Sequence, residues 1–360
     1  MTDRNPAFLW NAWHVGALSN EVGPDVLFAR RLLDKPVVFF RKQGSGEPVA
    51  MLDRCPHRFA YLSKGIRKGD EIECVYHGLR FGADGRCTHS PYQDAPPPGA
   101  DVETFPVVER HKMIWIWMGD RELANPAAIP DHSHMDRDDM RPLLWHVKFG
   151  GNWQLANDNL MELTHLFFLH TSTIGGWKEQ PGSTPGETYS ARVVGDKVIS
   201  RTFVPDNPEP GTFDNGVPRG TPFDQWNDTT WEAPANMRFT MGAVPAGTDP
   251  DTLEQPYMEQ SHCITPETAT SSHYFSGFTR IFELDRDEAG DWQFIEFFGG
   301  IFEREDGPIM EDIEAQMESH DLFAHSPVVL PRDKGAILVR RLVAQRIAEE
   351  QGDTRAEAAE

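Results

Sequence analysis

The chain has 360 residues, of which 39% are hydrophobic and 11% aromatic. This is the composition of a folded protein with room for two domains, and it excludes a disordered chain. The formal net charge of −22 argues against a nucleic-acid partner, because phosphate binding needs clustered Lys and Arg. An acidic surface can pair with a basic patch on an electron donor, although solubility alone is a sufficient explanation of the charge.

The sequence contains few signals for targeting to a membrane or for disulfide formation. The chain contains no apolar run long enough to cross a membrane, and its N-terminus lacks a secretory signal, so we expect a cytoplasmic protein without a membrane segment. Four cysteines in a chain of this length do not form a disulfide framework. Cys55 and Cys74 belong to the motif described below, which leaves Cys87 and Cys263 as expected free thiols.

Short β-rich runs at 37–40 and 49–52 lead into two Cys-His pairs. The first pair is Cys55-Pro-His57-Arg58, and the second, after sixteen intervening residues, is Cys74-Val-Tyr-His77-Gly78. Thiolates stabilise ferric iron and imidazoles raise its potential, so this set suits a Rieske [2Fe–2S] cluster. Cys55 and Cys74 would bind one iron, and His57 and His77 the other. The alternatives are a structural zinc site or four residues that never meet.

The segment after the second pair contains further hairpin signals. The pair Asp84-Gly85 predicts a tight turn, and residues 107–112 and 113–118 are expected to form a hairpin that closes an antiparallel β domain. Alternating Met113, Trp115 and Trp117 would line one face of it.

Between Asn125 and Pro142 the composition shifts to Pro, Asp, His and Met, which places the domain boundary there. Two histidines in this polar connector, His132 and His134, are expected to be solvated.

A second constellation of polar residues lies between Asn157 and His170. Leu160, Leu163 and Phe167 recur at helical spacing, which predicts a helix packed into the core of the second domain. His165 and His170 are about 140° apart on a regular helix, so they could share a metal ion only near a helix end or a π-type turn. The simpler alternative is two core histidines bonded to backbone.

A Rieske cluster carries single electrons, so an enzyme that uses one needs a second redox centre. Two imidazoles and one carboxylate with open positions suit non-haem Fe(II) and O2. Glu162 precedes His165 by three residues and is expected to accept a hydrogen bond from its free ring nitrogen. The third ligand is sought in the acidic stretch 303–316, where a helix is expected from Pro308 onward; composition does not choose between Asp306 and Asp312. The stretch 338–348 is patterned as an amphipathic helix.

Three groups of motifs resemble the oxygenase component of Rieske non-haem iron oxygenases. Within this family they are most similar to the branch of vanillate O-demethylase and dicamba monooxygenase. The groups are Cys55-Pro-His57-Arg58 with Cys74-x-x-His77-Gly78-Leu79; Glu109-Arg110 with Ile114-Trp-Ile-Trp117 and Gly119-Asp120; and Asp158-Asn-Leu-Met-Glu-Leu-Thr-His165 with His170. The resemblance extends over nearly the whole chain, to about residue 320.

The fold implied by this resemblance is α+β. It consists of an N-terminal antiparallel Rieske domain over 1–130 and a C-terminal helix-grip catalytic domain over 131–350, in which an antiparallel sheet packs against long helices. Residues 351–360 would be a disordered tail. The resemblance also implies a homotrimer in which the cluster of one subunit serves the mononuclear iron of its neighbour.

The family pattern Glu-Asp-x4-Glu matches Glu305, Asp306 and Glu311, and it implies Asp306 as the third iron ligand. The resemblance also places Asn159 near the iron. Three residues before the first histidine the branch commonly has an Asp that bridges to the neighbouring cluster histidine, here His77. This chain has Glu162 there, which is one methylene longer.

The resemblance further implies electrons from NAD(P)H that pass through a separate flavin reductase, with or without a ferredoxin, to the cluster and then to iron and O2. The favoured reaction is O-demethylation of an aromatic, methoxylated and carboxylated substrate with release of formaldehyde. Ring or methyl hydroxylation and N-demethylation by the same centres are alternatives. A Rieske electron carrier is the alternative outside enzymes.

Residues 200–300 contain strand-like runs that are expected to form the substrate pocket. We expect Arg238 and His262 to bind the anion of an aromatic acid, Arg238 through a bidentate pair. The alternative is that both face solvent from the other side of their strands. Phe297, with Phe294 and Phe298, is a candidate for the pocket wall.

Overall fold

The computed structural model describes residues 7–174, 186–207, 222–249, 252, 256, 258–280, 284–285 and 287–352. The chain forms two compact units. The first is Met1–Ile129 together with Thr265–Thr268, and the second is Pro130–Ile264 with Ala269–Glu360. A short piece from far along the chain therefore belongs to the first unit, which a boundary drawn along the sequence does not anticipate.

The first unit contains three small antiparallel sheets. Their strands are, in spatial order, β1 (Trp13–Leu18), β11 (Met113–Trp117) and β10 (Val107–Arg110); β2 (Phe28–Leu32), β3 (Lys35–Arg41), β4 (Pro48–Leu52) and β9 (Thr104–Phe105); and β5 (Ile66–Lys68), β6 (Glu71–Glu73), β7 (Arg80–Phe81) and β8 (Cys87–His89). This arrangement confirms the predicted antiparallel fold of the N-terminal part.

The predicted closing hairpin is β10 and β11, joined by His111 and Lys112, whose φ angles are +58° and +60°. Two consecutive residues with positive φ form the tight turn that suits the twist of paired strands. Met113, Trp115 and Trp117 alternate along β11, and every residue of β11 is buried, so both faces of this strand are covered. In its sheet β11 lies between β1 and β10.

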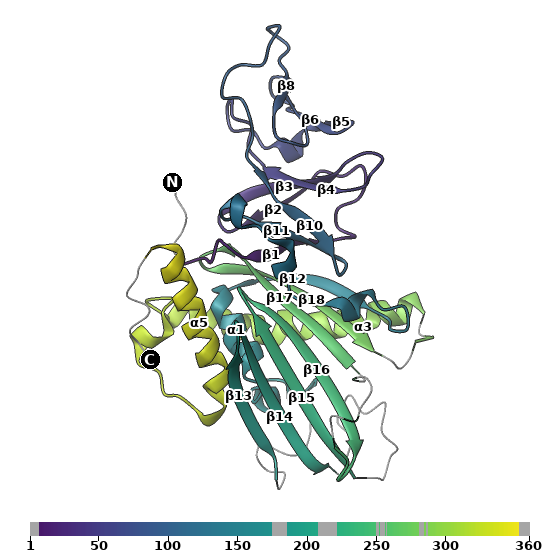
Figure 1. Ribbon diagram of the computed structural model, residues 1–360, viewed down its shortest axis with the longest axis vertical. Helices are drawn as coiled ribbons and strands as arrows, with labels where there is room; N and C mark the ends of the chain where they lie inside the picture. The colour runs from purple at the N-terminus through teal and green to yellow at the C-terminus, as the bar shows by residue number, and fades with distance from the viewer. Residues whose placement is uncertain are drawn as a thin grey trace. The chain divides into compact units, whose positions relative to one another are not determined.

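The second unit is built on one seven-stranded sheet (Figure 1). In spatial order its strands are β12 (Leu143–Gly150), β18 (Ser271–Arg280), β17 (Met258–Thr268), β16 (Asn236–Pro245), β15 (Phe223–Glu232), β14 (Lys197–Asn207) and β13 (Thr188–Val194). Every strand pair with a described register is antiparallel. A large antiparallel sheet with long helices confirms the predicted α+β class.

The helices of this unit are α1 (Trp153–Met161), α2 (Leu166–Leu169), α3 (Glu288–Ile301), the π-helical segment η6 (Phe302–Asp306), α4 (Gly307–Gln316) and α5 (Lys334–Glu350). Short 3-10 turns occupy Leu62–Lys64, Arg121–Leu123 and Pro126–Ala128 in the first unit, and Ser133–Asp136 (η4), Leu322–His325 and Pro331–Asp333 in the second. Helix α5 packs beside β13 and β14 (Figure 1). Within the described residues, no helix is both long and apolar enough to cross a membrane.

The two faces of the large sheet differ. One face, called here the helix-facing face, packs against the helices through aromatic contacts. Tyr274 lies 4.0 Å from Phe302, and Phe278 lies 4.8 Å from Phe298, measured between ring centroids. The opposite face carries Ser261, whose hydroxyl hydrogen-bonds to both His132 and His134.

These contacts correct the expectation for the connector histidines. His132 and His134 are each only 1% exposed, because η4 folds them against the sheet, where the Ser261 hydroxyl meets a ring nitrogen of each. Composition alone predicted that these histidines are exposed to solvent, because a polar segment that packs over a sheet has the same composition as a linker.

Two helix predictions also need correction. The helix expected across residues 157–170 stops at Met161, because Glu162 adopts an extended conformation and its carboxylate accepts a hydrogen bond from Thr164 N–H. The helix expected to begin at Pro308 is instead continuous with α3 through η6. Proline has no N–H for the carbonyl four residues earlier, and the wider π turn accommodates that loss.

Candidate metal centres

The two Cys-His loops of the first unit share one backbone pattern. Each cysteine carbonyl accepts from the N–H four residues later, and each cysteine N–H donates to the carbonyl five residues later. The bonds are Phe59 to Cys55 at 2.9 Å, Cys55 to Ala60 at 2.8 Å, Gly78 to Cys74 at 2.9 Å and Cys74 to Leu79 at 2.8 Å. In both loops the fourth residue has a positive φ, +62° at Phe59 and +73° at Gly78.

The two loops bring the two cysteines close to each other and the two histidines close to each other. Cys55 and Cys74 are 2% exposed, whereas the rings of His57 and His77 lie further out, with centroids 4.4 Å apart. Burial and the neighbouring Cys74 thiol raise the pKa of Cys55 to about 11. Burial, with the positive charges of His57 and Arg58, lowers the pKa of His77. Two inner thiols and two outer imidazoles fit a [2Fe–2S] cluster with one iron of each kind.

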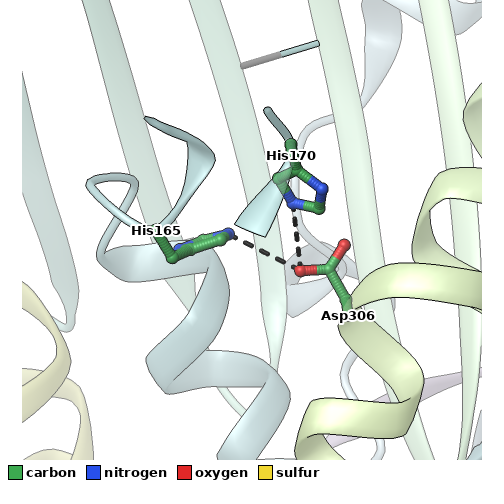
Figure 2. Close-up of side chains that lie close together, drawn as sticks. All are labelled: His165, His170 and Asp306. Atoms are coloured by element: carbon green, nitrogen blue, oxygen red, sulfur yellow. Dashed lines mark ion pairs between the residues drawn. The ribbon is translucent and has the colours of Figure 1, made fainter. Parts of the chain in front are cut away.

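In the second unit, His165, His170 and Asp306 form a group whose ligand atoms all lie within 4.8 Å of one another (Figure 2). Asp306 Oδ1 lies 3.6 Å from His165 Nε2 and 3.3 Å from His170 Nε2. The other carboxylate considered from sequence, Asp312, is exposed and outside this group. Two imidazoles and one carboxylate fit ferrous iron with open positions.

Local backbone geometry explains how two histidines five residues apart meet. His165 and His170 flank the single turn α2, and His170 leaves the helix with φ −97° and ψ +27°. The helix interruption lies before His165 rather than between the two histidines. The π turn considered for this region occurs on the helix of the carboxylate, where Gly307 N–H bonds to Phe302 O and Asp306 is 5% exposed.

Both imidazoles are held by a hydrogen bond at Nδ1. His170 Nδ1 donates to Glu305 Oε2 at 2.6 Å, and the same oxygen accepts from Thr173 Oγ1 at 3.0 Å. His165 Nδ1 donates to the backbone carbonyl of Glu162 at 2.7 Å. With Nδ1 protonated, each ring presents Nε2 as a lone pair toward Asp306, which is the tautomer that a metal ion requires.

The charges of the site favour a cation. Burial opposes protonation of His170, yet the carboxylates of Asp306 and Glu305 outweigh it and raise the pKa of His170 above its usual value. Asn159 lies beside the group, with its Nδ2 2.9 Å from Asp306 Oδ1 and 3.4 Å from His165 Nε2. The amide therefore donates to the carboxylate and fixes its orientation.

Glu162 is close to His165, but not in the way its spacing suggested. Its Oε2 lies 3.8 Å from His165 Nδ1, too far for a hydrogen bond, and its backbone carbonyl makes the contact instead. The cause is the end of α1 at Met161, which removes the helical register. Burial opposes ionisation of Glu162, but neighbouring His165 and Thr164 outweigh it and lower the pKa of the carboxyl.

Two supporting residues had no role in the sequence interpretation. Glu305 appeared only as the residue before Asp306 in the family pattern, and its bond to His170 depends on the fold. Arg340 in α5 forms a two-pronged ion pair with Asp158 in α1, with Nε–Oδ1 at 2.9 Å and Nη2–Oδ2 at 2.6 Å. Arg340 is 4% exposed. Its only sequence signal was a cation among the apolar positions of a C-terminal helix.

The structure separates the expected anion-binding pair. Arg238 is paired with Glu259 and Asp131 and is in register with Ser261, on the face opposite the helices. His262 faces Tyr274 and Phe239 on the helix-facing face. Ser261 and His262 are neighbours on β17, so their side chains point to opposite sides of the sheet. Arg238 lies on the Ser261 side, and it therefore cannot hold one carboxylate together with His262.

His262 is buried, which favours the neutral form of its ring. Burial lowers its pKa to about 3, and its ring nitrogens contact Tyr274 Oη at 2.5 Å and Gln260 Oε1 at 3.0 Å. Phe297 is 41% exposed and packs edge-on against Phe298, whereas Phe298 itself contacts the sheet through Phe278. The wall residues nearest the sheet are therefore Phe294 and Phe298.

Known proteins share both units. Residues 12–106 match the Rieske [2Fe-2S] domain, and residues 149–349 match the vanillate O-demethylase oxygenase C-terminal domain. The chain is 35% identical to the oxygenase component of chloroacetanilide N-alkylformylase from Rhizorhabdus wittichii, over 95% of this chain and 97% of that protein. It is 34% identical to the oxygenase component of dicamba O-demethylase from Stenotrophomonas maltophilia, over 93% and 96%.

The fold agrees with these matches. A crystal structure of dicamba monooxygenase bound to dicamba superimposes with a TM-score of 0.84 at 32% identity, covering 96% of this chain and 99% of the other. The two matched domains, the relatives and the superposition together show that this chain belongs to the vanillate O-demethylase branch of Rieske non-haem iron oxygenases and is an oxygenase component.

Proposed function

We propose that His165, His170 and Asp306 hold the mononuclear iron, that Cys55, His57, Cys74 and His77 hold the cluster, and that the enzyme removes a methyl or alkyl group from an aromatic substrate. The observation that carries the proposal is the group of two imidazoles and one carboxylate with ligand atoms within 4.8 Å. Bound ferrous iron supplies O2 activation, and a bound cluster supplies single electrons.

The protein's own residues prepare that site. Glu305 and the Glu162 carbonyl keep a proton on Nδ1 of each histidine, so that both Nε2 atoms stay available. Asn159 donates to Asp306 and holds one carboxylate oxygen toward the histidines. Glu162 keeps its carboxylate ionised beside His165, and we assign it the bridging role toward the cluster histidine of a neighbouring subunit.

For a methyl ether the reaction balances as follows. One oxygen atom of O2 is inserted into a C–H bond of the O-methyl group, and the other leaves as water after taking up two electrons and two protons. The resulting hemiacetal breaks its C–O bond and gives a phenol and formaldehyde. The electrons come from NAD(P)H through a flavin reductase, with or without a ferredoxin, that docks on this component.

The polar end of the substrate cannot depend on Arg238, which is already paired on the other face of the sheet. We assign His262 as a neutral hydrogen-bonding group of the pocket, beside Tyr274 and Gln260. Phe297 remains a candidate for the outer edge of the pocket because of its exposure.

A second candidate is N-dealkylation. The relative with 35% identity is named for removal of a group from nitrogen in chloroacetanilides, which are neutral amides. The neutral state of His262 and the engagement of Arg238 elsewhere favour such substrates over carboxylates.

We also propose a homotrimer. The cluster loops expose several apolar side chains, with Phe59 and Tyr76 each 60% and Val75 56% exposed in the single chain. An apolar rim around outward-facing histidines is suited to contact with another protein. Light scattering coupled to size-exclusion chromatography tests this: three subunits are expected, and a monomer would contradict it.

The function is tested by oxygen uptake with a surrogate reductase and NADH, across methoxybenzoates, neutral aryl methyl ethers and N-alkyl anilides, with formaldehyde assayed at the end. We expect substrate-dependent uptake with one formaldehyde for each O2 consumed on a methyl-bearing substrate. Uptake without an aldehyde product would point to ring hydroxylation, and no uptake by protein loaded with both metal centres would refute the proposal.

A further inference from the structure

The proposed iron site includes a contact between two helices that are far apart in the chain. Asn159 in α1 donates to Asp306 at the start of α4, with Nδ2 2.9 Å from Oδ1. The two residues are 147 positions apart in the sequence, so the chain itself does not hold them together. The contact therefore depends on whatever fixes α1 against α4.

A second contact joins the same two helices at their other ends. Glu314 in α4 accepts from the backbone N–H of Asn152, the residue that caps α1, with Oε2 2.9 Å from the nitrogen. The N–H groups at the start of a helix have no partner within it and carry partial positive charge, which suits a carboxylate. Because Asn152 meets Glu314 while Asn159 meets Asp306, the two helices run antiparallel.

The spacings along the two helices agree. Asn152 and Asn159 are seven residues apart, about 10.5 Å along α1, and Asp306 and Glu314 are eight residues apart, about 12 Å along α4. The flexible glutamate side chain absorbs this small difference. Two contacts of matched spacing prevent one helix from sliding along the other, so the contact at Glu314 fixes the level at which Asn159 faces Asp306.

Glu314 also belongs to a chain of hydrogen bonds that reaches α1 a second time, through α5. Its Oε1 accepts from His320 Nε2 at 2.8 Å, and the backbone carbonyl of His320 accepts from Arg340 Nη1 at 3.2 Å. Arg340 in turn holds Asp158, the residue before Asn159, in its two-pronged ion pair. The network therefore joins α1, α4 and α5, and it begins and ends on the helix that carries Asn159.

The charged groups of this network are shielded from solvent. The side chain of Arg340 is 4% exposed and that of Glu314 is 13% exposed. Exposed ion pairs contribute little to stability, whereas removing one partner of a buried pair is strongly destabilising. Stability alone would explain such a network, so iron affinity and folding stability have to be measured separately.

We propose that Glu314 and Arg340 are positioning residues for the iron site, which hold α1 against α4 so that the Asn159 amide meets Asp306. Glu314 acts through the N-terminus of α1, and Arg340 acts through Asp158. This inference deepens the proposed function and rests on it, because it takes His165, His170 and Asp306 as the iron ligands.

The experiment is anaerobic competition between a chelator and the full chain for the mononuclear ferrous iron, with urea unfolding of the same variants. Glu314→Ala should weaken iron binding by roughly 3- to 10-fold, less than the roughly 10- to 100-fold typical for a direct partner of a metal ligand. Glu314→Gln should restore most of the affinity. Its amide oxygen can accept from Asn152 N–H, and its NH2 can donate to His320 after a change of tautomer.

A double-mutant cycle tests the route by which Glu314 acts. In a chain that already carries Asn159→Ala, the further change Glu314→Ala should alter iron affinity by less than about 2-fold, because the contact that it supports is absent. Arg340→Lys should show the same non-additivity, since lysine keeps the charge but cannot form the two-pronged pair. If Arg340→Lys fails to fold, the Glu314 cycle decides alone.

The matched control is Val244→Ala, in the same unit as the iron site. Val244 in β16 is 5% exposed and lies on the same side of its strand as Arg238, away from the helices. Removing its buried methyl groups should lower the urea midpoint and leave iron affinity unchanged.

Full iron affinity in Glu314→Ala would overturn the proposal and leave the network a purely structural role. Equal losses from Glu314→Ala with and without Asn159 would also overturn it, because the effect would then not pass through that amide. A loss of iron affinity in Val244→Ala equal to that in Glu314→Ala would attribute both to stability, with the same consequence. Failure of the proposed function has a different signature: the unmodified chain would bind no ferrous iron that Asp306→Ala removes.

Discussion

The two candidate metal centres of this chain are built in different ways. Each cluster loop is a local structure in which one turn, repeated in two places, positions a cysteine and a histidine two or three residues apart. The mononuclear site joins a broken helix to a π segment more than a hundred residues later. The first type of site is encoded in short motifs, whereas the second exists only once the sheet and helices have packed.

The largest effect expected from this difference is at the assembled site. Asp306→Ala should remove the mononuclear iron and abolish oxygen uptake while leaving the cluster spectrum intact, because the cluster loops belong to the other unit. Iron analysis and visible absorption measure the two centres separately. Asp312→Ala, at an exposed carboxylate of the same acidic stretch, should change neither. Loss of the cluster in Asp306→Ala would show that the centres are not built independently.

A smaller effect is expected from the residue that orients a ligand. Glu305→Ala should lower iron affinity by roughly 10- to 100-fold, because His170 loses the acceptor that fixes its tautomer. Glu305→Gln keeps a hydrogen-bond acceptor without the charge, so its iron affinity should lie between those of the unmodified protein and Glu305→Ala. Competition with a chelator measures affinity without turnover. Thr173→Val is the control, since it removes the other hydrogen bond to the same oxygen; equal losses in Thr173→Val and Glu305→Ala would contradict the orienting role.

The first unit should respond to pH through a residue outside both centres. Burial lowers the pKa of His14 to about 4, although its hydrogen bond to Leu9 O acts in the opposite direction. In the unfolded chain the pKa of this histidine is near 6.5. Between these two pKa values the unfolded chain therefore binds a proton that the folded chain does not. Stability is therefore full above pH 6.5 and falls as the pH drops toward 4. Between pH 7 and 5 the loss is roughly 2 kcal/mol.

Urea unfolding of the unmodified chain and of His14→Gln at pH 7 and 5 isolates this effect. The glutamine can keep the bond to Leu9 O but does not titrate, so its stability should decline less over the same range. Parallel declines in both proteins would remove His14 as the cause.

The smallest effect tests whether the two cluster loops are equivalent. Gly78 has φ +73°, and an added Cβ would lie 3.2 Å from Pro91, so Gly78→Ala should destabilise the second loop by about 1–2 kcal/mol. Phe59 occupies the matching position with φ +62°, and Phe59→Gly should relieve strain there. Rates of cluster bleaching measure both changes. Faster bleaching in both variants would show that Phe59 contributes contacts that outweigh its backbone strain.

The sequence predicted the α+β class and the family because both follow from local signals. Short strands, the hairpin over residues 107–118 and the Cys-His spacings depend on neighbouring residues. The same signals failed at Glu162, where helical spacing predicted a side-chain contact and the chain instead ends a helix. They failed also at His132 and His134, since burial of a polar connector depends on a hydroxyl far along the chain.

Site residues were predictable to the extent that they sit in motifs. His165, His170 and Asp306 were named before the structure brought them together, although their role as iron ligands stays a prediction that metal analysis must test. Arg238 was misplaced because strand parity decides which face a residue takes, and the register with Ser261 is fixed by the sheet.

The π segment makes the position of Asp306, the proposed carboxylate ligand, depend on the number of residues in the helix. A π turn amounts to one additional residue within a helix that is otherwise regular on both sides. Because the wider turn absorbs that residue, α3 and α4 stay in phase with each other, whereas deleting a residue from the regular part of α3 would rotate everything after it by about 100°. Asp306 ends the π segment, so its direction depends on the length of this short stretch as well as on its residue types.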